Sequence, residues 1–313
     1  MFSEELEGLR NSEGRIDVSS IYEYDTGIKG KIKLDDAELF WKKKKDQTYS
    51  DLTEVLVSIL ARQIGLPTAR YELAECDEVE GVISYSVADK TDTIIDYNNF
   101  LFSHLPSHMK DYQATTSIMD LYETLKSKIA SETITKTEAN ELLRQHVTLL
   151  IFDVAIINTD RHNKNLLILE DEKNTIRLAP ALDNEMSFLA HFPTHIISGY
   201  LKSGKLEAVV KNQVTVTNNI LTIDSKTNSI TNYLLNLSET KYLFPELFEK
   251  TINKVFNLDI EKAIEIMETE QKTKLPEDYK EWVSLTFNTR LENIKDKFFY
   301  CDFIKPQHKD LEV

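Results

Sequence analysis

The chain has 313 residues, of which 41% are apolar and 28% are charged, a balance typical of globular rather than disordered proteins. Its net charge of −15 disfavours general binding to nucleic acids or anionic membranes, because both require surplus lysine and arginine. Cys76 and Cys301 lie far apart and predict neither a disulfide framework nor a zinc site. The acidic start lacks a signal-peptide pattern, and no stretch is apolar for long enough to span a membrane. We therefore expect a cytoplasmic protein with no membrane contact and no direct nucleic-acid partner.

Residues 12–45 are expected to form a β meander, because short apolar segments alternate there with turns. The expected strands are residues 15–22, 32–34 and 37–43. Gly27 and Gly30 lie in the first turn, three positions apart. Their backbone N–H groups could cover nucleotide phosphates, but an ordinary hairpin also uses glycine for positive φ, so both interpretations stay open.

A run of lysines ends the third expected strand. Side chains alternate along a strand, so Leu39, Trp41 and Lys43 share one face, and Lys42 lies on the other. A lysine at the end of an apolar strand can reach phosphates in a cleft. Lys43 is the first candidate for this role and Lys42 the second, and a solvated basic turn is the alternative.

From Ser50 the spacing of apolar residues becomes that of a helix, and Gly65 followed by Pro67 predicts the end of that helix. Glu54, near the start of the helix, could interact with its dipole or form an ion pair with the strand lysine. Two further strands are expected at residues 70–74 and 82–87. Residues 84–88 would then connect two lobes and face an adenine ring.

Most of the sequence after about residue 95 predicts helices, including residues 117–130, 136–157 and three more between 241 and 299. A short strand is expected at residues 214–217. The whole pattern predicts an α+β, two-lobed protein-kinase-like fold. Its small β-rich lobe would comprise residues 1–90, and its larger, mainly helical lobe residues 91–313.

Three oxygen-bearing side chains lie at the two ends of an expected hairpin between residues 158 and 183. Asp160 and Asn165 are five positions apart in a polar loop, and Asp183 follows the returning strand. Phosphoryl transfer requires one carboxylate for the attacking hydroxyl, and an amide and a second carboxylate for Mg²⁺. We therefore expect Asp160 to be catalytic and Asn165 and Asp183 to bind the metal. His162 could brace the loop or lie near the transferred phosphate.

The motif Asn158-Thr159-Asp160-Arg161-His162-Asn163-Lys164-Asn165, followed by Leu178-Ala179-Pro180-Ala181-Leu182-Asp183, resembles the HipA-like serine/threonine kinases, which are related to phosphoinositide kinases. The segments 53–55 and 65–67 are also similar to the small-lobe helix of that family. The resemblance covers residues 30–190 in ordered blocks. It implies that Lys43 binds ATP with Glu54 as its partner, that Asp160 and Asn165 are catalytic, and that Mg²⁺ lies at Asn165 and Asp183.

The resemblance further implies the toxin kinase of a bacterial toxin–antitoxin pair. Its substrate would be a protein such as an aminoacyl-tRNA synthetase, and its partner a cognate antitoxin protein. The chain is similar to compact family members that lack an extra N-terminal domain. Such kinases can autophosphorylate a loop serine, and Ser19, Ser20 and Thr26 are the nearby hydroxyl groups.

Two other functions remain open at this point. A nucleotide-binding pseudokinase that regulates a partner would need no phosphate transfer. A lipid kinase shares the Asp-Arg-His motif, but it would need a basic membrane-facing surface, to which a chain of net charge −15 is poorly suited.

Overall fold

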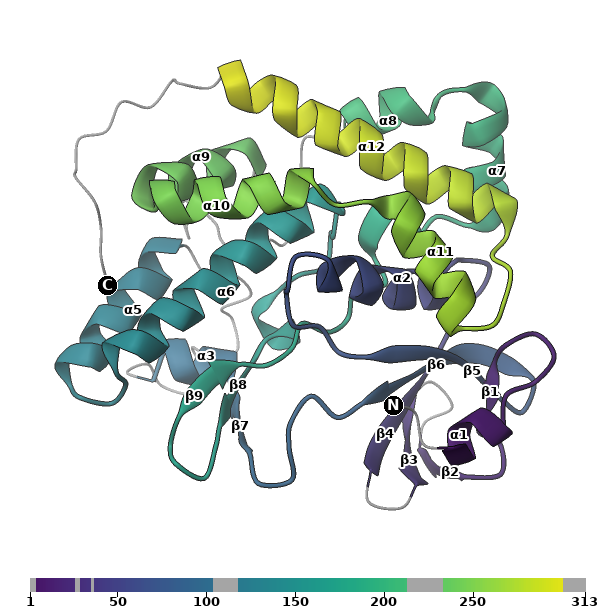
Figure 1. Cartoon of the computed structure of the whole chain (residues 1–313), viewed down its shortest axis with the longest axis horizontal. Helices are drawn as coiled ribbons and strands as arrows, with labels where there is room; N and C mark the ends of the chain where they lie inside the picture. The colour runs from purple at the N-terminus through teal and green to yellow at the C-terminus, as the bar shows by residue number, and fades with distance from the viewer. Residues whose placement is uncertain (1–3, 26–28, 35–36, 104–117, 213–232, 301–313) are drawn as a thin grey trace.

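The computed structural model describes residues 4–25, 29–34, 37–103, 118–212 and 233–300. The smaller lobe contains a six-stranded sheet in the order β1-β5-β6-β4-β3-β2 (Figure 1). Its strands are β1 (Ile16–Asp17), β2 (Tyr22–Asp25), β3 (Lys29–Leu34), β4 (Ala37–Lys43), β5 (Tyr71–Cys76) and β6 (Val79–Tyr85). β1 runs parallel to β5, and the other neighbouring strands are antiparallel.

The expected strand at residues 15–22 is wrong in one respect, because the structure divides it into β1 and β2 at opposite edges of the sheet. The Asp17 carboxylate accepts hydrogen bonds from the backbone N–H and the hydroxyl of Ser19, which form a local turn instead of a continued strand. The chain then crosses to pair with β3. The sequence segment alternates as a strand should, but nothing in that pattern shows where it pairs.

Each face of the sheet packs against a separate apolar core. One face packs against α2 (Ser50–Arg62), nearly all of whose residues are buried. The other face contributes Leu39 and Trp41 to a smaller cluster that includes Leu6 of α1 (Glu4–Gly8). α2 contacts both the sheet and α11 (Ile260–Glu270), which lies beside it in Figure 1.

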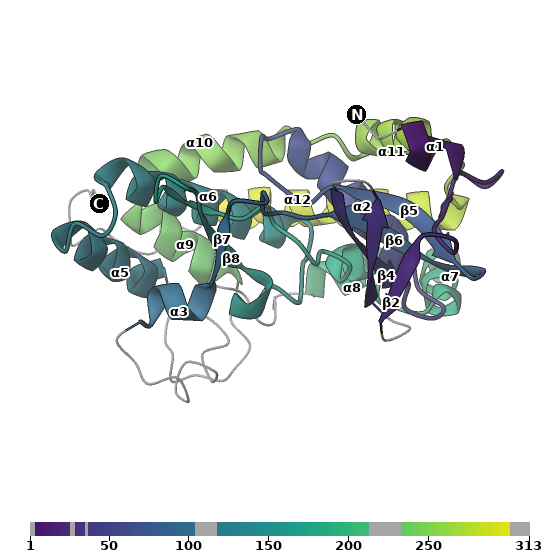
Figure 2. The ribbon, with the colours of Figure 1, turned by 90° about the horizontal axis from the view of Figure 1, so that it is seen from below.

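The larger lobe is mainly helical, and its small sheet has the order β7-β8-β9. These strands are β7 (Thr93–Asp96), β8 (Leu167–Glu170) and β9 (Ile176–Leu178). The remaining helices are α3 (Tyr97–Leu101), α5 (Ile118–Ala130), α6 (Lys136–Ala155), α7 (Thr194–Ser203), α8 (Leu206–Asn212), α9 (Tyr233–Leu243), α10 (Pro245–Phe256) and α12 (Glu277–Tyr300). Figure 2 shows this helical lobe beside the larger sheet.

Helix α6 leads the chain to the polar loop. A capping box between Thr135 and Glu138 defines its start, and the helix is buried from Leu142 onward with few exceptions. It ends at Ala155, close to the predicted end at residue 157. Because both of its ends are fixed by local sequence and by burial, α6 places the loop that follows it at a defined position.

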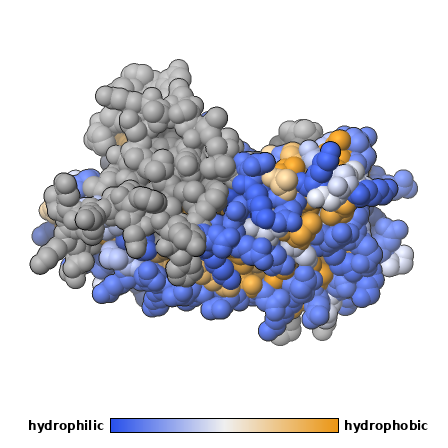
Figure 3. Space-filling view, turned by 90° about the horizontal axis from the view of Figure 1, so that it is seen from above, coloured by the Kyte–Doolittle hydropathy of each residue, from blue (hydrophilic) through white to orange (hydrophobic). Residues whose placement is uncertain are grey.

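The α+β, two-lobed kinase-like fold predicted from the sequence is confirmed. The predicted strand at residues 214–217 lies outside the described residues. Within the described residues, no helix combines the length and apolar character needed to cross a bilayer. Among the described residues on the face shown in Figure 3, most are hydrophilic, and apolar ones lie in smaller areas between them.

Candidate active site

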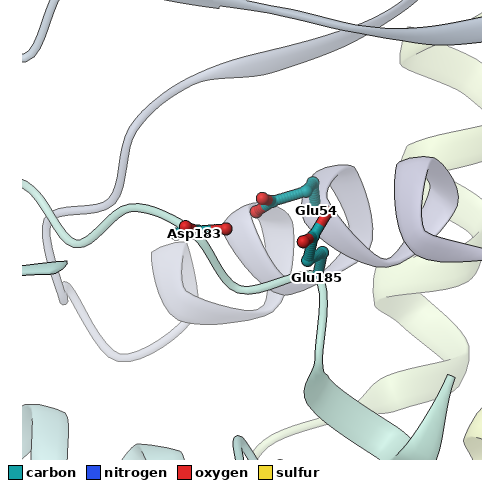
Figure 4. Close-up of side chains that lie close together, drawn as sticks. All are labelled: Glu54, Asp183 and Glu185. Atoms are coloured by element: carbon teal, nitrogen blue, oxygen red, sulfur yellow. The ribbon is translucent and has the colours of Figure 1, made fainter. Parts of the chain in front are cut away.

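A buried ion-pair cluster lies where β4, α2 and the loop after β9 meet. The Lys42 ammonium lies 3.1 Å from a carboxylate oxygen of Glu54, 2.6 Å from one of Asp183 and 2.9 Å from one of Glu185. Figure 4 shows these three carboxylates gathered from α2 and from the loop. Their oxygens lie within 4.8 Å of one another, and one lysine therefore joins both lobes.

The charges in this cluster stabilise each other. Burial alone would lower the pKa of Lys42, but Glu54, Asp183 and Glu185 together raise the pKa above its ordinary value. Lys42 is therefore a permanent cation at neutral pH. Burial raises the pKa of Glu54, and the charge of Lys42 opposes that rise. Glu54 also accepts a 2.8 Å hydrogen bond from the backbone N–H of Asn184, so both of its oxygens have partners.

The structure corrects the predicted partner of Glu54, because Lys42 and not Lys43 contacts it. The Lys43 side chain instead lies 3.2 Å from the exposed carboxylate of Asp46. The physical reason is the alternation of β4. Lys43 shares its face with Leu39 and Trp41, and that face packs against the smaller core rather than against α2.

Asp183 has an unusual backbone conformation, with φ at +59°. A non-glycine residue in this region is strained by about 1–3 kcal/mol and persists only where its surroundings fix it. Two hydrogen bonds do so here. The Asp183 N–H donates to the Tyr71 hydroxyl at 3.1 Å, and the next N–H, of Asn184, donates to Glu54. The strain therefore lies at the residue predicted to bind the metal.

Hydrogen bonds between side chains and backbone groups connect the catalytic-loop candidates. Asp160 is half-buried, and its N–H donates to the Asn158 side chain at 3.1 Å. Asn165 lies in the short helical turn η1 (Asn163–Asn165), and its Nδ2 donates to the carbonyl of Asp160 at 2.9 Å. The amide nitrogen is thereby occupied, and the Asn165 Oδ1 is the atom suited to a metal. His162 is half-buried, and its Nδ1 is buried without a partner among the described residues.

Arg161 connects this loop to the segment that contains Asp183. The side chain is fully buried and forms an ion pair with Asp153 of α6 at 3.0 Å. Its two terminal nitrogens also donate to the Leu182 carbonyl and to the Asn184 side chain, on either side of Asp183. One guanidinium therefore fixes the loop and the Asp183 segment relative to each other.

A cavity of about 450 Å³ adjoins the ion-pair cluster. It is lined by residues 84–87, the expected connection between the lobes, and by Lys42 and Asp183. Phe40 and Tyr71, which pair with Ser84 in the sheet, and Leu182 also line it. An apolar slot that includes charged groups fits a nucleotide in both size and chemistry. The oxygen donors of Asn165 and Asp183 likewise fit Mg²⁺, which prefers hard ligands.

The other predicted residues lie as follows. Gly30 is in β3 opposite Trp41 of β4, whereas Gly27 and Thr26 lie outside the described residues. The Ser19 hydroxyl lies between the Asp17 carboxylate and the N–H of Asp77, and Ser20 is exposed.

Sequence reasoning missed Glu185 and the role of Arg161 in this site. Glu185 follows Asp183 by two positions, but no spacing rule marks it. Arg161 belongs to the motif, yet only the structure reveals that its partners are Asp153, Leu182 and Asn184.

Two solved structures share this fold. A kinase from Helicobacter pylori, described as the proinflammatory kinase CtkA, matches with a TM-score of 0.70 at 16% identity, over 90% of this chain and 96% of that one. HipA of Shewanella oneidensis MR-1, solved with HipB and operator DNA as a toxin–antitoxin system, matches with a TM-score of 0.51 at 13% identity, over 88% of this chain. The match spans 65% of the Shewanella chain.

The sequence itself also has a family match, although no curated protein matches it. The family model described as the HipA-like C-terminal domain matches residues 26–229, about two thirds of the chain. That range contains the ion-pair cluster, the catalytic-loop candidates and the cavity beside them. The chain therefore belongs to the HipA-like C-terminal domain family.

Proposed function

We propose that this protein is an ATP- and Mg²⁺-dependent serine/threonine protein kinase. The observation that carries the proposal is the contact of Lys42 with both Glu54 and Asp183, at the charged end of a nucleotide-sized cavity. In kinases a lysine positioned by a helix glutamate binds phosphates, and a nearby aspartate binds the metal. Membership of the HipA-like family supports the same assignment.

Each residue has a defined task in this proposal. Glu54 positions Lys42, which binds the nucleotide phosphates, and backbone groups of residues 84–88 contact the base. Asp183 and the Asn165 Oδ1 hold Mg²⁺, which neutralises phosphate charge when it is bound. Asp160 accepts the proton of the attacking hydroxyl group, and His162 lies in the same loop. Gly27 and Gly30 remain candidates for a backbone cover over the phosphates.

The test is incubation with labelled ATP and Mg²⁺, alone and with protein substrates. The wild-type protein is expected to label itself or a substrate, and Asp160→Ala and Asp183→Ala are expected to abolish this labelling. Tyr242→Phe, far in sequence from the loop that contains Asp160, controls for effects of substitution and purification that do not involve the site. A wild-type protein that neither binds ATP nor transfers phosphate would falsify the proposal.

We further propose that this kinase is the toxin of a toxin–antitoxin pair and binds a cognate antitoxin. The Shewanella HipA structure, which contains HipB, supports this proposal. An aminoacyl-tRNA synthetase is the candidate substrate. Mass spectrometry of a lysate treated with wild type or with Asp160→Ala would identify proteins phosphorylated only by the active form. If no protein differs between the two samples while ATP still binds, a regulatory pseudokinase is the better description.

A further inference from the structure

We propose that Lys45 is a second phosphate-binding cation, which contacts the terminal phosphate of a nucleoside triphosphate. This inference rests on the proposed function, because it concerns the same nucleotide site. Glu185 places Lys45 there. One carboxylate oxygen of Glu185 lies 2.9 Å from the Lys42 ammonium, and the other lies 2.8 Å from the Lys45 ammonium.

The environment of Lys45 differs from that of an ordinary surface lysine. Its side chain is 47% exposed, yet its ammonium approaches a carboxylate whose side chain is only 8% exposed. It also lies 3.2 Å from the Met186 sulfur. A lysine at the surface gains little from such pairing, because water solvates both charges well. Here the carboxylate is buried, so the pairing directs Lys45 toward the cluster and leaves part of its side chain open to a ligand.

The order of groups along the cavity indicates which phosphate Lys45 would meet. The cavity is lined by residues 84–87 at the lobe connection and also by Lys42 and Asp183. Phe40 lies opposite Ser84 in the sheet, so Lys42 is two residues further along β4 than the position level with the connection. Lys42 lines the cavity, whereas Lys45 and Glu185 do not. Lys45 is joined to Lys42 through the Glu185 carboxylate, so its ammonium lies beside the cavity next to Lys42. A nucleotide whose base lies at the lobe connection places its first phosphates at Lys42, and its last phosphate is the one nearest to Lys45.

The charge balance of the cluster supports a second cation. Glu54, Asp183 and Glu185 are three carboxylates around a single ammonium, that of Lys42. An anionic ligand that approaches them would be repelled unless further positive charge is present. Mg²⁺ at Asp183 supplies part of this charge. Lys45 supplies another part on the side of Glu185.

The experiment measures dissociation constants for ATP, ADP and AMP at fixed Mg²⁺ by titration calorimetry, for the full chain. Lys45→Met is expected to weaken ATP binding by about tenfold and to leave AMP binding within about twofold, since one direct charge-assisted contact is lost. Lys45→Arg is expected to retain most of the preference for ATP. Lys43→Met is the matched control, because Lys43 belongs to the same run of lysines and its ammonium pairs with the exposed Asp46 instead of with the ion-pair cluster. It is expected to bind all three nucleotides as the wild type does.

A paired variant separates direct contact from charge neutralisation. Lys45→Met alone removes a positive charge that neutralises Glu185. The stronger negative charge could weaken ATP binding even if Lys45 never contacts a phosphate. In Lys45→Met/Glu185→Gln both charges are absent, and the preference for ATP is still expected to be reduced. The inference is overturned if this double variant regains the wild-type preference, or if Lys45→Met weakens AMP and ATP equally or not at all. Loss of ATP binding by the wild type itself would instead overturn the proposed function.

Discussion

At the scale of single residues, the site depends on side chains that connect segments as well as on those that face a ligand. Arg161 is the clearest example. It is buried, it neutralises Asp153, and it donates to the groups on both sides of Asp183. Removing a buried ion-pair partner typically costs about 3–5 kcal/mol, because the other charge remains buried without compensation. A test of Arg161 must therefore keep the charge and remove only the additional hydrogen bonds.

Arg161→Lys meets this requirement. A lysine can still neutralise Asp153, but it lacks the planar fork that reaches Leu182 and Asn184 at the same time. We expect the protein to fold with a loss of about 1–3 kcal/mol, and its apparent affinity for Mg²⁺ to weaken by about tenfold or more because Asp183 is less well positioned. Thermal unfolding and Mg²⁺ titrations of activity are the measurements.

Arg144→Lys is the matched control for this substitution. Arg144 is half-exposed on the same helix as Asp153 and pairs with Glu141, one turn away. Neither stability nor Mg²⁺ dependence should change measurably in that variant, since surface pairs contribute little. Identical Mg²⁺ titrations for Arg161→Lys and the wild type would show that the bonds of Arg161 to Leu182 and Asn184 do not position Asp183 for the metal.

The same scale shows what the sequence can predict and what it cannot. Asp160, Asn165 and Asp183 can be proposed from the sequence because phosphate and metal chemistry requires carboxylate and amide oxygens, and these three follow one another across a predicted hairpin. The structure joins Asn165 to the Asp160 backbone and Asp183 to Lys42. The lysine is harder, since Lys42 and Lys43 differ only in which face of β4 they occupy. The apolar Leu39 and Trp41 mark a buried face, but both faces of this sheet are covered. Burial therefore does not identify the face of the cleft, and only the position of α2 decides it.

At the scale of elements, a buried carboxylate joins β5 to two helices. Glu72 accepts a 2.8 Å hydrogen bond from Gln271 at the end of α11 and lies 3.3 Å from Arg10, which follows α1. Gln271 also accepts a bond from the N–H of Leu73. Burial raises the pKa of Glu72 to about 7, although Gln271 and Arg10 oppose the rise. Elements from both ends of the chain thus meet at a titratable group.

This raised pKa predicts a specific dependence of stability on pH. The folded protein binds the Glu72 proton more tightly than the unfolded chain, whose ordinary value is 4.5. The resulting stabilisation is fully present below pH 4.5 and is lost as the pH rises through about 7. Its upper limit is about 3 kcal/mol, from the difference between the two pKa values. Urea denaturation between pH 5 and 8 should show a smaller loss of stability in Glu72→Gln than in the wild type.

A second buried group, His146, changes the stability of the fold with pH in the opposite direction. It therefore determines the pH range in which the effect of Glu72 can be measured. Burial lowers the pKa of His146 from 6.5 to about 4, so its contribution to stability is present above 6.5 and is lost as the pH falls. The two effects oppose each other between pH 4.5 and 6.5. Above this range His146 no longer contributes a pH dependence, and the comparison of Glu72→Gln with the wild type isolates the part that belongs to Glu72. Glu13→Gln, at an exposed position, is the control. Equal pH slopes for Glu72→Gln and the wild type would contradict the assignment.

At the scale of the whole molecule, α2 belongs to the small lobe by sequence order but is fixed by helices of the large lobe. At its start, the Tyr49 hydroxyl donates to Asp278 at 2.8 Å, and Asp278 also accepts a bond from Ser198 of α7. At its end, Gln63 exchanges two 2.8 Å hydrogen bonds with the backbone of Asp259. Contacts within this chain at both ends of α2 thus position Glu54, and Glu54 in turn positions Lys42.

Asp278→Ala should therefore loosen α2 and disturb the site from a distance. The substitution removes the hydrogen bonds to Tyr49 and Ser198 and does not change the Glu54 or Lys42 side chain itself. We expect faster hydrogen exchange in the first turns of α2, a loss of about 1–2 kcal/mol in stability and weaker nucleotide binding, because Glu54 then positions Lys42 less well. Glu281→Ala, at an exposed position of the same helix α12, should leave the exchange of α2 unchanged.

The comparison of these two variants decides how the lobes are coupled. If Asp278→Ala increases exchange in α2 and weakens nucleotide binding together, the C-terminal helices fix the geometry of the ion-pair cluster. If exchange in α2 is unchanged, its other contacts, with the sheet, with α11 and through Gln63, suffice, and the bonds at the start of the helix are dispensable. In the first case a partner that contacts α12 or α7 can act on the site, because a change there reaches Lys42 through one helix. In the second case a change at these bonds does not reach Lys42.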